Sequence, residues 1–142
     1  MPTDSVAEAA IARVLARCES PDLLVGRRLL AIWLFGSHAR GEARPDSDVD
    51  LGVLCDPPLG IERPRWIDVL SREAGLEVDV IDLATANPTL AWEVVTSGRL
   101  VLERDERAAE AFLRRARYAA EDDARRNRMI VLAQSPALGA RE

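Results

Sequence analysis

Lysine is absent from this chain, and all 19 of its basic residues are arginines. The absence excludes Schiff-base chemistry, a phosphate-binding P-loop lysine and a lysine general base. The only histidine is His38, which excludes any mechanism that needs two histidines. The 24 acidic residues outnumber the basic ones and give a formal net charge of −5, so we expect no strong general binding of nucleic acid.

Cysteine is also scarce, and no long apolar run is present. Cys18 and Cys55 match no metal-binding spacing, and we expect both to be buried, reduced thiols. No apolar stretch approaches the roughly 18 residues of a membrane span, and the first residues lack the pattern of a signal peptide. The sequence therefore predicts a cytoplasmic protein with no membrane partner.

The length and composition are typical of one globular domain: 142 residues, 48% apolar and 30% charged. Hydrophobic periodicity and turn residues predict helices over about 6–18, 63–74, 88–97 and 105–132, and strands over about 29–35, 49–55, 77–83 and 100–103. This order indicates an α/β (α+β) fold in which a small mixed sheet of about four strands is backed by helices. We expect a single domain over residues 1–133, with its core at 28–104, and a flexible tail over 134–142.

Two acidic residues, Asp48 and Asp50, stand two positions apart at the predicted start of the second strand. Because side chains alternate faces, both carboxylates should point the same way, about 7 Å apart along the strand. No arginine adjacent in the sequence offsets their repulsion. A divalent cation is the natural counter-charge, and hard oxygen ligands favour Mg²⁺ or Mn²⁺.

The same alternation selects a third carboxylate from the next predicted strand. There Val78 and Val80 form the apolar face, and Asp79 points to the other one. If both strands pack their apolar faces on one core, Asp79 arrives beside the first two aspartates. Asp82 shares the apolar face with the two valines and is therefore the weaker candidate.

A second functional element precedes the aspartates. Gly36 and Ser37 directly follow a predicted buried strand, and we expect them to open a short helix. Free N–H groups at a helix start, together with a serine hydroxyl, bind phosphate oxygens. Arg40 in the same loop either clamps a phosphate or braces the loop through nearby carboxylates. Three carboxylates and a phosphate-binding turn in one cleft are the equipment of phosphoryl or nucleotidyl transfer.

The residues over 36–41 and 47–51 resemble the signature of the DNA polymerase β-type nucleotidyltransferase superfamily. More narrowly, they resemble the minimal nucleotidyltransferase antitoxins of the MntA type, which the later run over 78–83 also fits. The resemblance covers roughly residues 28–104. It is carried by the joint pattern of Gly-Ser, a ten-residue interval and Asp-x-Asp at the start of an apolar strand.

The resemblance implies a site, a reaction and a partner. Asp48, Asp50 and Asp79 would bind two Mg²⁺ ions and serve as the catalytic carboxylates, while Gly36 and Ser37 would contact the β- and γ-phosphates of ATP. Members of this group transfer AMP to a tyrosine hydroxyl of a partner HEPN-domain RNase toxin and so neutralise it. The resemblance therefore implies an active adenylyltransferase that acts as the antitoxin of a toxin–antitoxin pair.

Two other functions remain open at this point. A small-molecule nucleotidyltransferase, such as one that modifies an aminoglycoside, would use the same core, although 142 residues leave little room for a substrate-binding extension. An antitoxin that acts by occlusion alone would need no catalysis. The arginine-rich helix predicted over 105–132 forms either a solvated face of mixed charge or a surface that docks an acidic partner.

Overall fold

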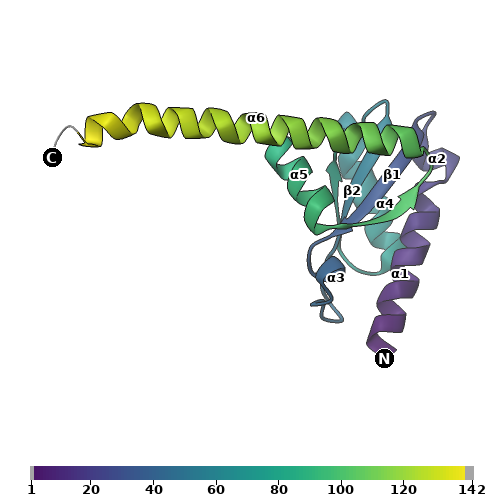
Figure 1. Cartoon of the computed structure of the whole chain (residues 1–142). Helices are drawn as coiled ribbons and strands as arrows, with labels where there is room; N and C mark the ends of the chain where they lie inside the picture. The colour runs from purple at the N-terminus through teal and green to yellow at the C-terminus, as the bar shows by residue number, and fades with distance from the viewer. Residues whose placement is uncertain (1, 140–142) are drawn as a thin grey trace.

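The order of helices and strands along the chain largely follows the hydrophobic periodicity. The computed structural model describes residues 2–139, and the side chains of residues 6–130 (Figure 1). The strands are β1 (Arg28–Phe35), β2 (Val49–Asp56), β3 (Val78–Asp82) and β4 (Arg99–Glu103). The helices are α1 (Pro2–Cys18), α2 (Pro21–Leu24), α3 (Ser37–Arg40), α4 (Arg63–Ala74), α5 (Pro88–Ser97) and α6 (Glu106–Gly139), with a 3₁₀ turn, η1 (Gly60–Glu62), before α4.

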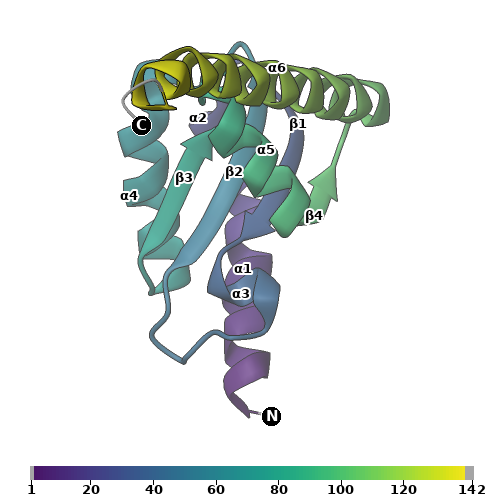
Figure 2. The same cartoon turned by 60° about the vertical axis from the view of Figure 1, so that its left-hand side comes forward.

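The four strands form one mixed sheet in the order β3-β2-β1-β4. β1 pairs antiparallel with β2 and with β4, whereas β2 and β3 are parallel. Figure 2 shows β3 and β2 side by side, with α3 near the end of the sheet at which β2 begins. The predicted α+β fold, a small mixed sheet backed by helices, is confirmed.

One face of the sheet packs against α1 and α4. Alternate residues of β2, such as Val49 and Leu51, are fully buried on this face, as are Val78 and Val80 of β3. They share one core with the fully buried Trp66 of α4. The alternation of valine and leucine with polar residues thus gives the two central strands their orientation.

The opposite face packs against α5 and α6. Trp33 of β1 lies against Phe112 of α6, with ring centroids 6.0 Å apart. α5 passes directly over Gly52 of β2, where a Cβ atom would overlap the Val94 side chain. Asn87 caps α5 as predicted, since its side chain accepts a hydrogen bond from the Leu90 N–H at 2.8 Å.

The structure differs from the sequence predictions near the N-terminus and before α4. α1 begins at Pro2 rather than near residue 6, and α2 and η1 were not predicted. Ser20 and Pro21 were interpreted as the end of α1, but they also stand at the N-cap and first position of α2. A serine followed by proline is a common helix start, so the signal for α2 is present in the sequence.

α6 is longer than predicted and projects beyond the sheet (Figure 1). It continues to Gly139, past the predicted helix end near residue 132, and residues 140–142 lie outside the described residues. The predicted end relied on the proline and glycine after residue 133, but the residues just before them are mostly strong helix formers that continue the helix. The flexibility expected of residues 134–142 stays a prediction. No helix in the part of the chain that the structure describes is long and apolar enough to cross a membrane.

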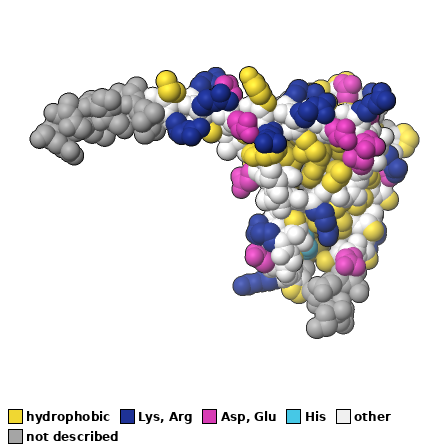
Figure 3. All heavy atoms as spheres, viewed as in Figure 1, with side chains coloured by type: hydrophobic (Ala, Val, Ile, Leu, Met, Phe, Trp, Pro, Cys, Tyr) yellow, Lys and Arg dark blue, Asp and Glu magenta, His cyan; other side chains and the backbone are white. Residues whose placement is uncertain are grey.

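The charged face of α6 carries both signs. Figure 3 shows arginine side chains along the helix, with acidic ones between them. Arg117 pairs with Glu121 at 3.1 Å, and Arg126 pairs with Asp122 at 2.8 Å. Such exposed pairs are typical of a solvated helix face and contribute little to stability.

Both cysteines are buried, as predicted, and neither forms a disulfide. Burial raises the pKa of the Cys18 and Cys55 thiols to about 12. Because the thiolate is the reactive form, we expect neither thiol to react with a disulfide reagent at pH 8 until the protein unfolds. Ellman's reagent should therefore detect both thiols in guanidinium and neither in buffer, whereas rapid reaction of the native protein would contradict their burial.

Candidate active site

Pairing across three strands aligns the residues that the sequence singled out. Phe35 of β1 pairs with Asp50 of β2, and Asp50 pairs with Asp79 of β3. Neighbouring strands lie about 4.8 Å apart, so the two aspartates are adjacent across the parallel ladder. The prediction from side-chain alternation that Asp79 arrives beside Asp50 is confirmed. We call Asp50 and Asp79, together with Asp48 just before β2, the carboxylate row. Asp82 lies on the opposite face and is buried away from this row.

The electrostatics of Asp50 reflect its burial and the two neighbouring carboxylates. Asp48 lies one residue before β2 and is exposed, whereas Asp50 is half-buried. Burial raises the pKa of Asp50, and repulsion from Asp79 and then from Asp48 raises it further. His38 and Arg40 oppose this shift to a smaller extent. A negative charge at Asp50 is therefore unfavourable without a cation.

The donor set fits a hard divalent cation. Carboxylate oxygens are the ligands that Mg²⁺ prefers, and the repulsion at Asp50 is what a bound dication would relieve. Within residues 6–130, the Asp50 carboxylate takes part in no hydrogen bond or ion pair. The same part of the chain holds no preassembled group of three His, Cys, Asp or Glu side chains. The aspartates are thus neighbours, and their side chains would have to converge on an ion.

Gly36 and Ser37 follow the end of β1, where Gly36 closely approaches Asp50. Gly36 has a φ of 74° and a ψ of −155°, and α3 begins at Ser37, so the predicted short helix is confirmed. A Cβ atom at position 36 would overlap the Asp50 carboxylate. Only glycine adopts this backbone conformation readily and leaves this space open. The two halves of the sequence motif are therefore in contact.

The loop between α3 and β2 is held by local hydrogen bonds. A ring nitrogen of His38 lies 3.2 Å from the Ser47 carbonyl oxygen, and the Arg44 backbone N–H donates to the Ser47 hydroxyl at 2.7 Å. Arg40 donates through Nε to Glu42 at 3.0 Å. Arg40 thus braces the loop, which is one of its two predicted roles. Its ion pair is largely exposed and weak, so it does not prevent contact with a phosphate.

Arg63 is a residue of the site that sequence reasoning missed. Its Nη2 lies 3.3 Å from Asp79 Oδ1, and its Nε donates to the Val80 carbonyl oxygen. We expected no arginine beside the first two aspartates, and none adjoins them in the sequence. Asp79 nevertheless has an arginine beside it, because α4 begins on the opposite face of the sheet and β3 is an edge strand. Nothing in the local sequence marks this contact.

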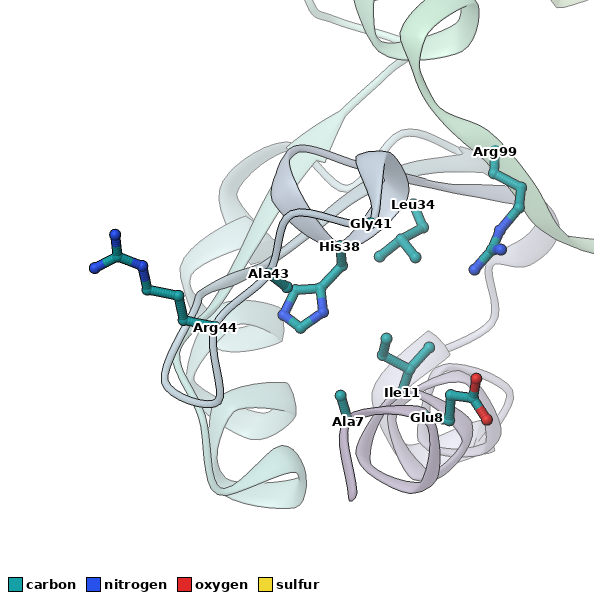
Figure 4. Close-up of a pocket in the computed structure, with 9 residues that line it drawn as sticks. All are labelled: Ala7, Glu8, Ile11, Leu34, His38, Gly41, Ala43, Arg44 and Arg99. Atoms are coloured by element: carbon teal, nitrogen blue, oxygen red, sulfur yellow. The ribbon is translucent and has the colours of Figure 1, made fainter. Parts of the chain in front are cut away.

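The site lies apart from a cavity of about 260 Å³ between α1, the α3 loop and β4 (Figure 4). His38 points into this cavity, while Arg44 points away from it. Leu34, which lines the cavity, belongs to the face of the sheet that packs on α1 and α4. None of the three aspartates lines it, and Asp50 and Asp79 alternate with core residues of that face and so lie on the other one.

Comparison with known families agrees with this geometry. Residues 23–107, more than half of the chain, match the family described as Polymerase beta, Nucleotidyltransferase. The matched range contains the Gly-Ser turn and all three aspartates of the row. This chain belongs to that family of nucleotidyltransferases.

Two named relatives refine the comparison. The protein adenylyltransferase MntA of Shewanella oneidensis is 36% identical over 73 residues, which make up 51% of this chain and 52% of that protein. The alignment thus spans only about half the length of this relative. The probable protein adenylyltransferase MntA of Haemophilus influenzae is 29% identical over 105 residues, which cover 72% of this chain and 85% of that protein.

A solved structure is similar over nearly the whole fold. A crystal structure of a toxin–antitoxin with AMP-PNP contains a chain with a TM-score of 0.69 and 25% identity. The match covers 90% of this chain and 97% of the other. Together with the two named relatives, it confirms the resemblance to MntA-type minimal nucleotidyltransferases that the sequence motifs carry.

Proposed function

We propose that this chain is a Mg²⁺-dependent adenylyltransferase that moves AMP from ATP to a hydroxyl group of a partner protein. The observation that carries the proposal is the contact of Gly36 with Asp50, which in turn pairs with Asp79. This row brings a phosphate-binding turn and acidic ligands together on one face of the sheet. Asp48, Asp50 and Asp79 are the proposed catalytic and metal-binding residues.

The carboxylate row also suggests where each substrate would bind. Gly36 and Ser37, with Arg40, would hold the β- and γ-phosphates at the β1 end of the row. Asp79 lies at the opposite end, on the edge strand, where an acceptor can approach. The acceptor oxygen would attack the α-phosphorus, the bond to the β-phosphate oxygen would break, and pyrophosphate would leave. Asp79 would take the acceptor proton.

Two Mg²⁺ ions, when bound, would neutralise the charge that develops on the phosphates. Asp48 and Asp50 would contribute to holding both ions. The chain's own part is to place the carboxylates and the Gly36–Ser37 turn on neighbouring strands. The pairing of β1, β2 and β3 in one sheet supports this arrangement.

The partner is proposed from the relatives. Both named relatives are described as protein adenylyltransferases, one of them as probable, and the similar solved structure is that of a toxin–antitoxin with AMP-PNP. We therefore propose that this chain is a cytoplasmic antitoxin and that its acceptor is a tyrosine of a HEPN-domain toxin. A binding-only antitoxin and a small-molecule nucleotidyltransferase are the alternatives that an experiment must separate.

A labelling experiment with ATP labelled at the α-phosphate tests this function. We expect the purified chain and Mg²⁺ to label one protein in a lysate of its own organism, on a tyrosine located by mass spectrometry. Asp48→Asn is the control, because it should remove one carboxylate of the site without touching the core. Label on a small molecule would favour the alternative transferase. Protection of cells from the toxin without any label would favour binding alone.

A further inference from the structure

The start of α4 places the positive charge of Arg63 beside the Asp79 carboxylate, at the edge of the sheet. Arg63 is the first residue of α4, which packs on the face opposite the carboxylate row. Because β3 is the edge strand, the Arg63 side chain reaches Asp79 around it without crossing the sheet. Asp50 lies on β2, the inner neighbour of β3, so Asp79 is adjacent both to Asp50 of β2 and to Arg63 of α4.

The contacts distinguish the two oxygens of Asp79. Oδ1 accepts a hydrogen bond from the Val80 backbone N–H at 2.9 Å and lies 3.3 Å from Arg63 Nη2. Among the hydrogen bonds and ion pairs of residues 6–130, none involves Oδ2 of Asp79. Oδ1 is thus held by contacts within the protein, and Oδ2 is available to a ligand.

The backbone that carries Arg63 is itself anchored to β3. Arg63 Nε donates to the Val80 carbonyl oxygen, so one guanidinium bridges the carboxylate and the backbone of the same strand. Just before α4, the Gly60 N–H donates to Asp82 Oδ2 at 3.0 Å, and the Thr85 hydroxyl donates to the same oxygen at 2.9 Å. Asp82 is only 5% exposed, so this anchor is buried.

Stability does not account for the Arg63–Asp79 pair. The two side chains are 42% and 47% exposed, so water screens their attraction and the pair contributes little to folding. A planar guanidinium that bridges two acceptors fixes an orientation, which a single screened charge does not. The arrangement therefore matters for where the Asp79 carboxylate points.

We propose that Arg63 is a positioning residue for nucleotidyl transfer: it holds Oδ1 of Asp79 at the sheet edge, so that Oδ2 is the oxygen presented to the metal and to the acceptor. This inference rests on the proposed function, because it assigns Asp79 to the reacting end of the carboxylate row. In this proposal Arg63 itself would contact neither nucleotide nor acceptor. Its effect passes through Asp79.

Steady-state kinetics of two variants test the role. Arg63→Met removes the bridge, and we expect kcat for AMP transfer to fall about 10- to 100-fold, as is typical when a partner of a metal ligand is lost. The KM for ATP should stay unchanged, because the phosphates bind at the other end of the row. Arg63→Lys keeps the charge but cannot bridge both acceptors, so it should also lose most of kcat. Full activity of Arg63→Lys would mean that a positive charge beside Asp79 is sufficient, and it would overturn the positioning role of the bridge.

A direct metal titration makes the test independent of the acceptor. With Mn²⁺ and a non-hydrolysable ATP analogue, electron paramagnetic resonance should show that Arg63→Met binds one ion at least about tenfold more weakly than the unmodified chain. Arg65→Met is the matched control, since Arg65 lies on the same helix and donates to the Asp22 carbonyl oxygen instead. In an Asp79→Asn background, Arg63→Met should add no further loss.

The outcomes separate this inference from the proposed function. Unchanged or tighter Mn²⁺ binding in Arg63→Met, with normal kcat, would overturn the positioning role and leave the transferase proposal intact. A wild-type chain that binds no Mn²⁺ with the nucleotide analogue would instead overturn the proposed function. An equal loss in Arg63→Met and Arg65→Met, matched by a lower Tm, would show a purely structural role.

Discussion

Asp50→Asn is expected to lower AMP transfer about a thousandfold, because the site loses a charge worth several kcal/mol of metal and transition-state stabilisation. Asp50 is the middle member of the row, beside Gly36 on one side and Asp79 on the other. The proposed role has Asp50 contribute to holding both ions, so its loss weakens both metal positions. Asparagine has the same shape and leaves the packing of β2 unchanged.

The measurement is the rate of label transfer from ATP, with Asp56→Asn as the matched control. Asp56 is the last residue of the same strand and is exposed at its far end, so its substitution should leave transfer unchanged. Circular dichroism of both variants verifies that the fold is intact. Turnover of Asp50→Asn at the rate of the unmodified chain would disprove the metal-dependent mechanism.

The same substitution has a predictable effect on stability. The pKa of Asp50 is raised in the folded protein, mainly by burial and then by Asp79. Stability from this group is therefore fully present below its unfolded pKa, near 3.8, and is lost as the pH rises through the raised value. Without Mg²⁺, ionisation of Asp50 therefore opposes folding, and at neutral pH we expect Asp50→Asn to unfold at a denaturant concentration no lower than that of the unmodified chain.

The position of the carboxylates could be predicted because it depends on local alternation. Buried Val49 and Leu51 orient β2, buried Val78 and Val80 orient β3, and the aspartates between them have only one face left. Parallel pairing of two strands with the same pattern then makes Asp50 and Asp79 neighbours. The Gly-Ser turn was predictable for a similar reason, since it directly follows a strand of continuous apolar residues.

The contacts that the sequence did not reveal depend on how distant elements pack. Arg63 reaches Asp79 only because α4 lies on the far face and begins beside an edge strand. Side-chain alternation places Asp82 on the buried face, but it does not reveal the hydrogen bonds that Asp82 receives there from Gly60 and Thr85. Neither arrangement leaves a periodic signal, because each joins residues whose spacing is set by a loop.

Gly36→Ala is expected to lower AMP transfer at least about a hundredfold, the effect of misplacing a catalytic group by roughly 1 Å. The new methyl group would overlap the Asp50 carboxylate and displace it from the row. The backbone at Gly36, with a φ of 74° and a ψ of −155°, adds a strain of about 1–3 kcal/mol for any other residue. The substitution therefore affects both the turn that would hold the phosphates and the central carboxylate.

Gly41→Ala separates strain from the clash with Asp50. Gly41 also has a positive φ, 72°, but a Cβ atom there meets nothing within 4 Å. Alanine at position 41 should cost about 1–2 kcal/mol of stability, measured by denaturant unfolding, and leave transfer unchanged at a temperature where the variant is folded. If both variants transferred AMP equally well, the contact between Gly36 and Asp50 would have no part in catalysis. A selective loss in Gly36→Ala would instead support the view that the proposed phosphate turn and the carboxylate row act as one site.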